Sequence, residues 1–175
     1  MRIAPRWWGL MALLAALLLL LLLPLGWGHR AHLRSSIDIA RSPTEVFEYV
    51  TTPGNWPQWH PSSLAVHGST DHPLDTGEQV TEDFIVAGRR GQVVWTVIAR
   101  EPERRWVIRG QVAGGGEGII SYTLTPIPSG THFQRDFDYA FRQLLLIILD
   151  RVQIRERVSA ESEAALQHLK ANLEH

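Results

Sequence analysis

The chain has 175 residues, a formal net charge of −1 and no cysteine. Its length suits one ordinary domain with a short appendage. The small net charge gives no electrostatic reason to expect a nucleic-acid partner, because such binding depends on clustered cations. The absence of cysteine excludes disulfides, thiolate catalysis and cysteine-based metal sites.

An apolar segment dominates residues 1–34. Trp7–Gly28 has no charged side chain, and Leu10–Leu23 is almost entirely leucine and alanine. About twenty helical residues, at about 1.5 Å each, span the ~30 Å apolar core of a bilayer. We therefore expect a membrane anchor, with one transmembrane helix at about residues 8–28 and a short linker before the domain.

A cleaved signal peptide is the alternative for this segment, because it also begins with positive charge. The apolar run is long for such a peptide, however, and Leu23–Ala31 has no clean small-x-small cleavage site. A retained anchor predicts a single-pass protein of a bacterial inner membrane, with the lipid bilayer as a partner. Arginines flank both ends of the span, so only the short N-terminal tail favours a domain outside the cytoplasm.

The next segment is a short capped helix that follows a predicted strand at Ser35–Ala40. Ser42 suits the N-cap position, and Glu45 lies three residues later, where it completes a capping box. Pro43 suits the first helical position. Pro53–Gly54 is expected to end the helix.

Two tryptophans follow in a segment that has room for only one or two helical turns. Trp56 and Trp59 lie three residues apart in Asn55–His60, so they project from one side of such a turn. They are expected either to roof the entrance of a cavity or to fill the space between the short helices and a sheet.

The following residues alternate as strands joined by short turns, which predicts an antiparallel meander. The expected strands are Ser63–His67, Gln79–Ala87, Gln92–Arg100, Arg105–Val112, Gly118–Thr125 and His132–Tyr139. Turns are expected at Gly88–Gly91, at Gly114–Gly116 and at Pro126–Gly130. From about Phe141 to the end the apolar spacing is helical.

Several motifs in this order resemble those of the START-like superfamily, also called SRPBCC or polyketide cyclase/dehydrase-like. Ile37–Phe47 resembles its opening strand and helix start, and Asn55–Trp59 (NWPQW) resembles its n-W-p-x-W segment. Gly130–Thr131 and Ala165–Glu174 resemble its closing strand and helix. The likeness spans residues 35–175, which we expect to form the domain.

The resemblance implies an α+β helix-grip fold. A curved antiparallel sheet of about seven strands, with two short helices, would grip a long C-terminal helix over an apolar cavity. It also implies a hydrophobic ligand, such as a lipid, an isoprenoid or a polyketide-like compound, bound or transferred by a membrane-tethered domain. Two alternatives stay open: a cyclase or dehydratase that uses the same cavity, and a structural or interaction module at the membrane.

Strand parity places two charged residues among apolar ones. Glu82 shares a face with Val80, Phe84 and Val86, and Arg135 shares one with Phe133, Phe137 and Tyr139. A buried charge is costly unless it is paired, so these two residues are expected to pair or to hold a polar ligand group, unless they lie at open strand ends. The candidate cavity residues are Trp56, Trp59, Glu82, Phe84, Trp95, Tyr122, Arg135, Phe137, Leu145 and Ile148.

No catalytic, cofactor-binding or metal site is predicted, which favours binding over catalysis. His60 has no orienting partner in the sequence, and the polar loop with His67, Asp71 and His72 lacks a fixed metal-ligand spacing. Leu144–Leu149 is apolar all round, so it is expected either to pack in the core or to form a cavity mouth that faces a membrane.

Overall fold

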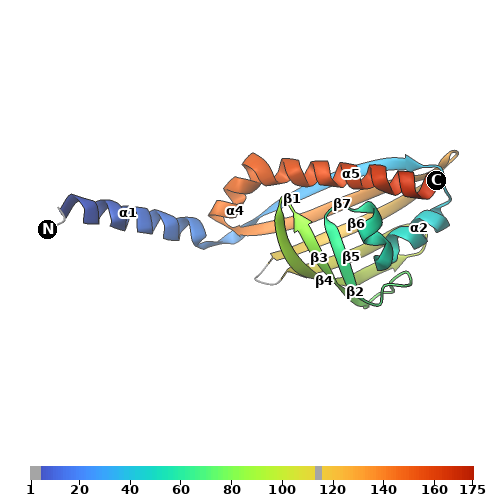
Figure 1. Ribbon diagram of the computed structural model, residues 1–175, viewed down its shortest axis with the longest axis horizontal. Coiled ribbons are helices and arrows are strands. Elements are labelled where there is room, and N and C mark those ends of the chain that lie inside the picture. The colour runs from blue at the N-terminus through green and yellow to red at the C-terminus, as the bar shows by residue number, and fades with distance from the viewer. Residues whose placement is uncertain (1–4, 113–115) are drawn as a thin grey trace.

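The computed structural model describes residues 5–112 and 116–175 (Figure 1). Within these residues it has one seven-stranded sheet, in which every neighbouring pair of strands is antiparallel. The spatial order is β1-β7-β6-β5-β4-β3-β2. The strands are β1 (Pro24–Ile39), β2 (Ser63–Gly68), β3 (Gln79–Val86), β4 (Arg89–Glu101), β5 (Arg105–Val112), β6 (Gly116–Ile127) and β7 (Gly130–Gln143).

The helices lie mainly against one face of this sheet. Figure 1 shows α5 running along the sheet, with α2 near the C-terminal end of α5. The helical segments are α1 (Pro5–Leu22), α2 (Pro43–Thr51), a 3-10 turn (Pro53–Asn55), α3 (Trp56–Trp59), α4 (Leu144–Leu149), a π-helical segment (Asp150–Ile154) and α5 (Arg155–Glu174). This is the arrangement of a curved sheet that holds a long C-terminal helix.

The predicted capping box at the start of α2 is confirmed. The Ser42 hydroxyl accepts a hydrogen bond from the Glu45 backbone N–H at 3.3 Å, and Glu45 Oε2 accepts one from the Ser42 backbone N–H at 2.9 Å. Each side chain therefore satisfies a backbone donor that the first helical turn leaves free.

The predicted transmembrane helix is wrong. Helix α1 has 18 residues, or about 27 Å at 1.5 Å per residue, and it ends before Pro24, which has no N–H to continue a helix. Across the described residues, no helix is both long enough and apolar enough to cross a membrane. The single-pass localisation in a bacterial inner membrane is therefore wrong as well, and the bilayer partner that depended on it has no support.

Strand β1 takes up the end of the predicted anchor and the whole linker. Its register with β7 runs from His29 to Ile39 and is supported by polar pairs. Arg34 Nε donates to Asp136 Oδ1 at 2.7 Å, and His32 Nδ1 lies 2.9 Å from Asp138 Oδ1. Such pairs do not follow an apolar alternation, which is why the sequence pattern predicted only the last part of this strand.

The β3–β4 hairpin turns earlier than expected. Ala87 and Gly88 have φ angles of +49° and +78° and connect β3 directly to β4. Two successive positive φ angles characterise the type I′ turn, whose twist suits a two-residue hairpin. Arg89 and Arg90 are therefore the first residues of β4, and not the tip of the turn as predicted. The expected turn at Gly114–Gly116 lies outside the described residues except for Gly116.

The last helix is interrupted by the π-helical segment Asp150–Ile154. It begins at Leu144, after the predicted position, because β7 continues to Gln143. At the interruption, Asp150 is fully buried. The Tyr139 hydroxyl donates to Asp150 Oδ1 at 2.6 Å, and Arg155 Nη2 donates to Asp150 Oδ2 at 3.1 Å. This network attaches the π-helical segment to β7.

An aromatic cluster lies between the sheet and the short helices. Trp106 is completely buried and stacks on Tyr122 with a centroid distance of 5.4 Å and an interplanar angle of 24°. Trp56 meets the Trp106 ring edge-on at 6.2 Å. Helix α5 covers this cluster and the adjoining sheet with Ala165, Leu166 and Leu169, all of which are buried. The core is therefore concentrated toward the C-terminal half of α5.

Candidate functional site

A cavity of about 240 Å³, here called the inner cavity, lies between the sheet and the N-terminal half of α5. Strands β3 to β7, α3 and α5 all contribute to its lining. Its walls are mainly apolar and include Phe84, Val93, Ile108, Ile120 and Phe137. The volume is several times the ~30 Å³ that one water molecule occupies in the liquid, so the cavity has room for an organic ligand.

The predicted cavity residues divide into two groups. Those that line the inner cavity are Trp56, Trp59, Glu82, Phe84, Trp95, Tyr122, Arg135 and Phe137. Leu145 and Ile148 are not among its lining residues; Leu145 is half-buried and Ile148 is exposed. Strand parity indicated the inward direction of Glu82, Phe84, Arg135 and Phe137 because a strand presents alternate residues to one face, whereas an apolar helix gives no such indication of direction. That a ligand contacts these residues stays a prediction.

A second hollow, here called the outer groove, adjoins the inner cavity. Both are lined by Phe84, Val86, Val112, Gly116 and Ile154. The outer groove also has walls from Leu146 and Leu149 of α4 and from the start of β4. Because the two hollows share walls at the β3–β4 hairpin, the inner cavity has its opening there.

Strand register places three polar lining residues at the opposite end from this opening. Glu82 precedes the shared wall residues Phe84 and Val86 along β3. On β6 and β7, Tyr122 is paired directly with Arg135. Tyr122 lies farther along β6 than Gly116, which borders the outer groove. The cavity therefore runs from an open mouth to an inner end that carries Glu82, Tyr122 and Arg135.

Glycines on the inner face of the sheet make space for aromatic rings. A Cβ atom at Gly110 would lie 2.5 Å from the Trp95 ring, and one at Gly118 would lie 2.9 Å from the Phe137 ring. Both distances are too short for real contacts, so each ring lies close against the backbone of a neighbouring strand. Larger residues at these positions would displace the rings, and the cavity depends on their absence.

Glu82 and Arg135 both face the inner cavity, but they do not form an ion pair in the described part of the chain. Trp95 Nε1 donates to Glu82 Oε2 at 2.6 Å, and Arg135 Nη1 donates to the Ser162 hydroxyl at 2.9 Å. Burial raises the pKa of Glu82, although its hydrogen bonds and the Arg135 charge oppose this. Of the two arrangements expected from the sequence, the ion pair is not formed. Glu82 and Arg135 have separate hydrogen-bond partners, and the Arg135 charge acts on Glu82 only through space.

His60 adds a neutral hydrogen-bond donor to the same end of the cavity. The Ser62 backbone N–H donates to His60 Nδ1 at 3.3 Å, so the proton of the neutral ring is on Nε2. Burial, and then the Arg135 charge, lower the pKa of His60 well below its usual value. The ring is therefore uncharged near neutral pH and presents Nε2–H as a donor.

Tyr122 completes the polar inner end. Burial raises the pKa of its hydroxyl to about 12, so it remains protonated near neutral pH. Its ring lies 6.3 Å from Trp59 and 5.4 Å from Trp106. Of the two arrangements expected for Trp59, its packing against the sheet is that of a residue that fills the space between α3 and the sheet, and it also bounds the inner end of the cavity.

Glu161 of α5 joins two other parts of the cavity wall. Its Oε1 accepts a hydrogen bond from the Ala87 backbone N–H at 3.0 Å, and its Oε2 accepts one from the Ser62 hydroxyl at 2.9 Å. A single carboxylate thus connects α5, the β3–β4 turn and the segment after α3. These contacts hold the helix in position over the cavity.

Four polar lining residues were missed from the sequence: Ser62, Glu117, Glu161 and Ser162. Ser162 lies four residues after Val158 and four before Leu166, on the buried stripe of α5. A polar residue at such a position was the available signal, because buried polar groups need partners. Glu161 offered no comparable signal, since its partners come from distant segments.

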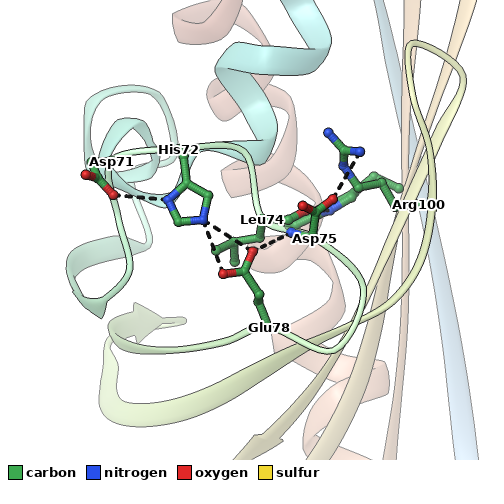
Figure 2. A network of polar contacts seen from close by, with 7 residues as sticks. Asp71, His72, Leu74, Asp75, Glu78 and Arg100 are labelled. Atoms are coloured by element: carbon green, nitrogen blue, oxygen red, sulfur yellow. Dashed lines mark hydrogen bonds and ion pairs between the residues drawn. The ribbon is translucent and has the colours of Figure 1, made fainter.

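The polar loop between β2 and β3 is held by hydrogen bonds and ion pairs among its own side chains (Figure 2). His72 lies between Asp71 and Glu78, with N···O distances of 3.1 and 3.2 Å. These contacts raise the pKa of His72, with the Asp71 hydrogen bond as the largest cause. Among the described residues, no group of three or more His, Asp or Glu side chains is arranged so that it could hold a metal ion. The network secures the loop next to the core residue Leu74.

Solved structures with the same fold share little sequence with this chain. Protein CV1439 from Chromobacterium violaceum is 16% identical with a TM-score of 0.65, and the match covers 82% of this chain and 98% of that one. Protein jhp0584 from Helicobacter pylori is 12% identical with a TM-score of 0.65, over 82% of this chain and 88% of that one. DynU16, a protein of the dynemicin biosynthetic locus, is 22% identical with a TM-score of 0.61, and the match covers 82% of this chain and 47% of DynU16.

The family assignment comes from a sequence-family match. No curated protein matches the chain. Residues 30–174 match the family described as polyketide cyclase / dehydrase and lipid transport. The match covers the whole sheet except the start of β1, together with every helix except α1. The chain therefore belongs to the polyketide cyclase / dehydrase and lipid transport family.

Proposed function

We propose that the chain binds an apolar small molecule with one oxygen-bearing end, such as a lipid, an isoprenoid or a polyketide-like compound, in the inner cavity. The oxygen-bearing end lies at the inner end of the cavity, and the apolar body extends toward the opening. A cavity of this size counts against the alternative of a purely structural module, which would have a filled core.

One observation carries this proposal. Within the described residues, Arg135 Nε and His60 Nε2 are buried nitrogens without a hydrogen-bond partner. Leaving a buried donor unpaired costs about 1–3 kcal/mol, and folded proteins rarely do so. A ligand oxygen between these two donors would accept both hydrogen bonds, while the apolar walls would take the rest of the molecule.

Fluorescence titration with prodan, a naphthalene dye with one ketone oxygen, tests this function. We expect the full chain to bind prodan, and we expect Gly110→Ala to weaken binding at least about tenfold, because the new methyl group displaces the Trp95 ring toward the cavity. Gly9→Ala is the matched control, since its Cβ atom would meet nothing within 4 Å and Gly9 lines neither hollow. A thermal melt of each variant separates lost binding from lost folding. Absence of prodan binding to the folded wild-type chain, or equal binding by both variants, would count against the proposal.

A second candidate function, a cyclase-type reaction, is favoured by the gathering of Glu82, Tyr122, Arg135 and His60 around one cavity. In an aldol cyclisation, the Glu82 carboxylate would take a proton from the carbon next to a ketone. The enolate oxygen would accept hydrogen bonds from Arg135 and His60. That carbon would attack a second ketone, whose oxygen takes up the proton and becomes a hydroxyl. A second proton from the same carbon and this hydroxyl would then be lost together as water, so that the C–O bond breaks and a carbon–carbon double bond forms. One carbon–carbon bond forms, and no oxidant or reductant is needed.

Heptanedione with its two ketones separated by three methylene groups is a minimal substrate for this second function. Its cyclisation gives water and a methylcyclohexenone, which is followed by its ultraviolet absorbance. Because Glu82 acts as a base only when ionised, we expect the rate to rise as pH increases through its raised pKa. Glu82→Gln should remove this dependence and lower the rate at least about a hundredfold. A wild-type rate equal to that of Glu82→Gln at every pH would exclude the reaction.

A further inference from the structure

We propose that the outer groove binds an acidic group on the ligand, so that the full ligand is an amphiphile with its anionic end at the cavity opening. This inference rests on the proposed function, because it assigns the second end of the same bound molecule. Its chemical class is a monomeric carboxylate, sulfate or phosphate compound with an apolar body.

The charges of the groove favour an anion. Its lining includes the three cations Arg89, Arg90 and Arg157, and only one carboxylate, Asp83. That carboxylate is already engaged, because it accepts a hydrogen bond from Gln92 Nε2 at 2.8 Å and lies 3.0 Å from His67 Nε2. Asp83 offsets one of the three arginine charges, so the lining keeps an excess of two positive charges.

The three arginine side chains have no ion pair or side-chain hydrogen bond elsewhere in the described part of the chain. They come from different walls of the groove. Arg89 shares the cavity-facing side of β4 with Gly91 and Val93, because alternate residues of a strand face the same way. Arg157 comes from α5, where it lies one residue before the buried Val158. Free guanidinium groups on two walls suit an anionic group placed between them.

The apolar part of the groove explains why the anion should belong to an amphiphile. Leu146 and Leu149 of α4 line the same groove as the arginines. The groove and the inner cavity also share apolar walls at Phe84, Val86 and Ile154. A molecule that leaves the inner cavity thus passes between apolar side chains and reaches guanidinium groups at the surface. A free inorganic anion would contact only the guanidinium groups and would leave the apolar walls uncovered.

Two dyes that differ by one acidic group test the inference. Anilinonaphthalene sulfonate is phenylnaphthylamine with an added sulfonate, and both become fluorescent in apolar sites. We expect the full chain to bind the sulfonate dye more tightly than the neutral dye. Arg89→Gln combined with Arg157→Gln should weaken the sulfonate dye about tenfold and the neutral dye less than about twofold. Added salt should weaken the sulfonate dye alone.

The matched control is Arg104→Gln combined with Arg109→Gln, which removes two exposed arginines that line neither hollow. It should leave both affinities unchanged. Equal weakening of the sulfonate dye by both double variants, or no weakening by Arg89→Gln with Arg157→Gln, overturns the inference. Failure of the neutral dye and prodan to bind the wild-type chain would instead overturn the proposed function, so the two failures are distinguishable.

Discussion

Replacing Arg135 with methionine is expected to weaken prodan binding about tenfold to a hundredfold without destabilising the fold. A hydrogen bond from a charged donor contributes about 1.5–3 kcal/mol, and each 1.4 kcal/mol changes affinity about tenfold. Phenylnaphthylamine, which has no ketone oxygen, should bind the variant about as well as it binds the wild-type chain. Fluorescence titration of both dyes measures the difference.

The stability expectation for the same variant follows from the surroundings of Arg135. Its side chain is 5% exposed and donates to the neutral hydroxyl of Ser162. A buried charge costs several kcal/mol of desolvation, and Arg135 has no ion-pair partner among the described residues, so its replacement by an apolar side chain of similar length should cost little stability. Urea denaturation measures this change, with Arg109→Met on the exposed face of β5 as the control. Unchanged prodan affinity, or a loss of several kcal/mol of stability, would show that Arg135 is a structural residue.

Trp106→Ala is expected to lower the free energy of unfolding by about 3–5 kcal/mol, the usual cost of removing a large aromatic side chain from a core. Trp106 is 0% exposed, stacks on Tyr122 at 5.4 Å and donates from Nε1 to the Leu74 carbonyl at 3.3 Å. The alanine variant therefore loses ring contacts and leaves the Leu74 carbonyl without this donor. Because small domains are stable by only about 5–15 kcal/mol, this is a large part of the total.

Urea denaturation of Trp106→Ala and Trp7→Ala gives a matched comparison. Trp7 is 66% exposed in α1, so its replacement should change the free energy of unfolding by less than about 0.5 kcal/mol. Trp106→Phe should be intermediate, since it keeps a ring against Tyr122 but loses the hydrogen bond. Similar losses for Trp106→Ala and Trp7→Ala would contradict the assignment of the core to the aromatic cluster.

Local patterns were sufficient to predict much of the sheet and the start of α2. The capping box at Ser42 depends on residues three positions apart, and the alternation around Glu82 and Arg135 depends on neighbours within one strand. These features are local, so the sequence records them directly. The same parity arguments selected side chains that do line the inner cavity, from Glu82 on β3 to Arg135 and Phe137 on β7.

Features that depend on contacts between distant segments could not be read in this way. The early part of β1 pairs with β7 through Arg34 and Asp136, which are far apart in the sequence. The helix predicted to cross a membrane is shortened by Pro24, whose effect is visible in the sequence, but the strand that replaces its end requires β7 as a partner. In the same way, Leu145 and Ile148 were placed in the cavity because an apolar helix does not indicate which side faces inward.

The polar residues of the cavity were likewise predicted in part from neighbours within one strand, while their contacts depend on segments that are distant in the sequence. Strand alternation was enough to identify two charged residues among apolar side chains, and the family resemblance implied a fold with an internal cavity. The arrangement of that pair came from the folded chain, in which Glu82 binds the Trp95 indole and Arg135 binds Ser162. Hydrogen-bond partners are chosen by geometry across strands and helices, and a linear pattern contains no information about these distances. The polar inner end and the arginine-lined opening therefore emerged only when β3, β4, β7 and α5 were brought together.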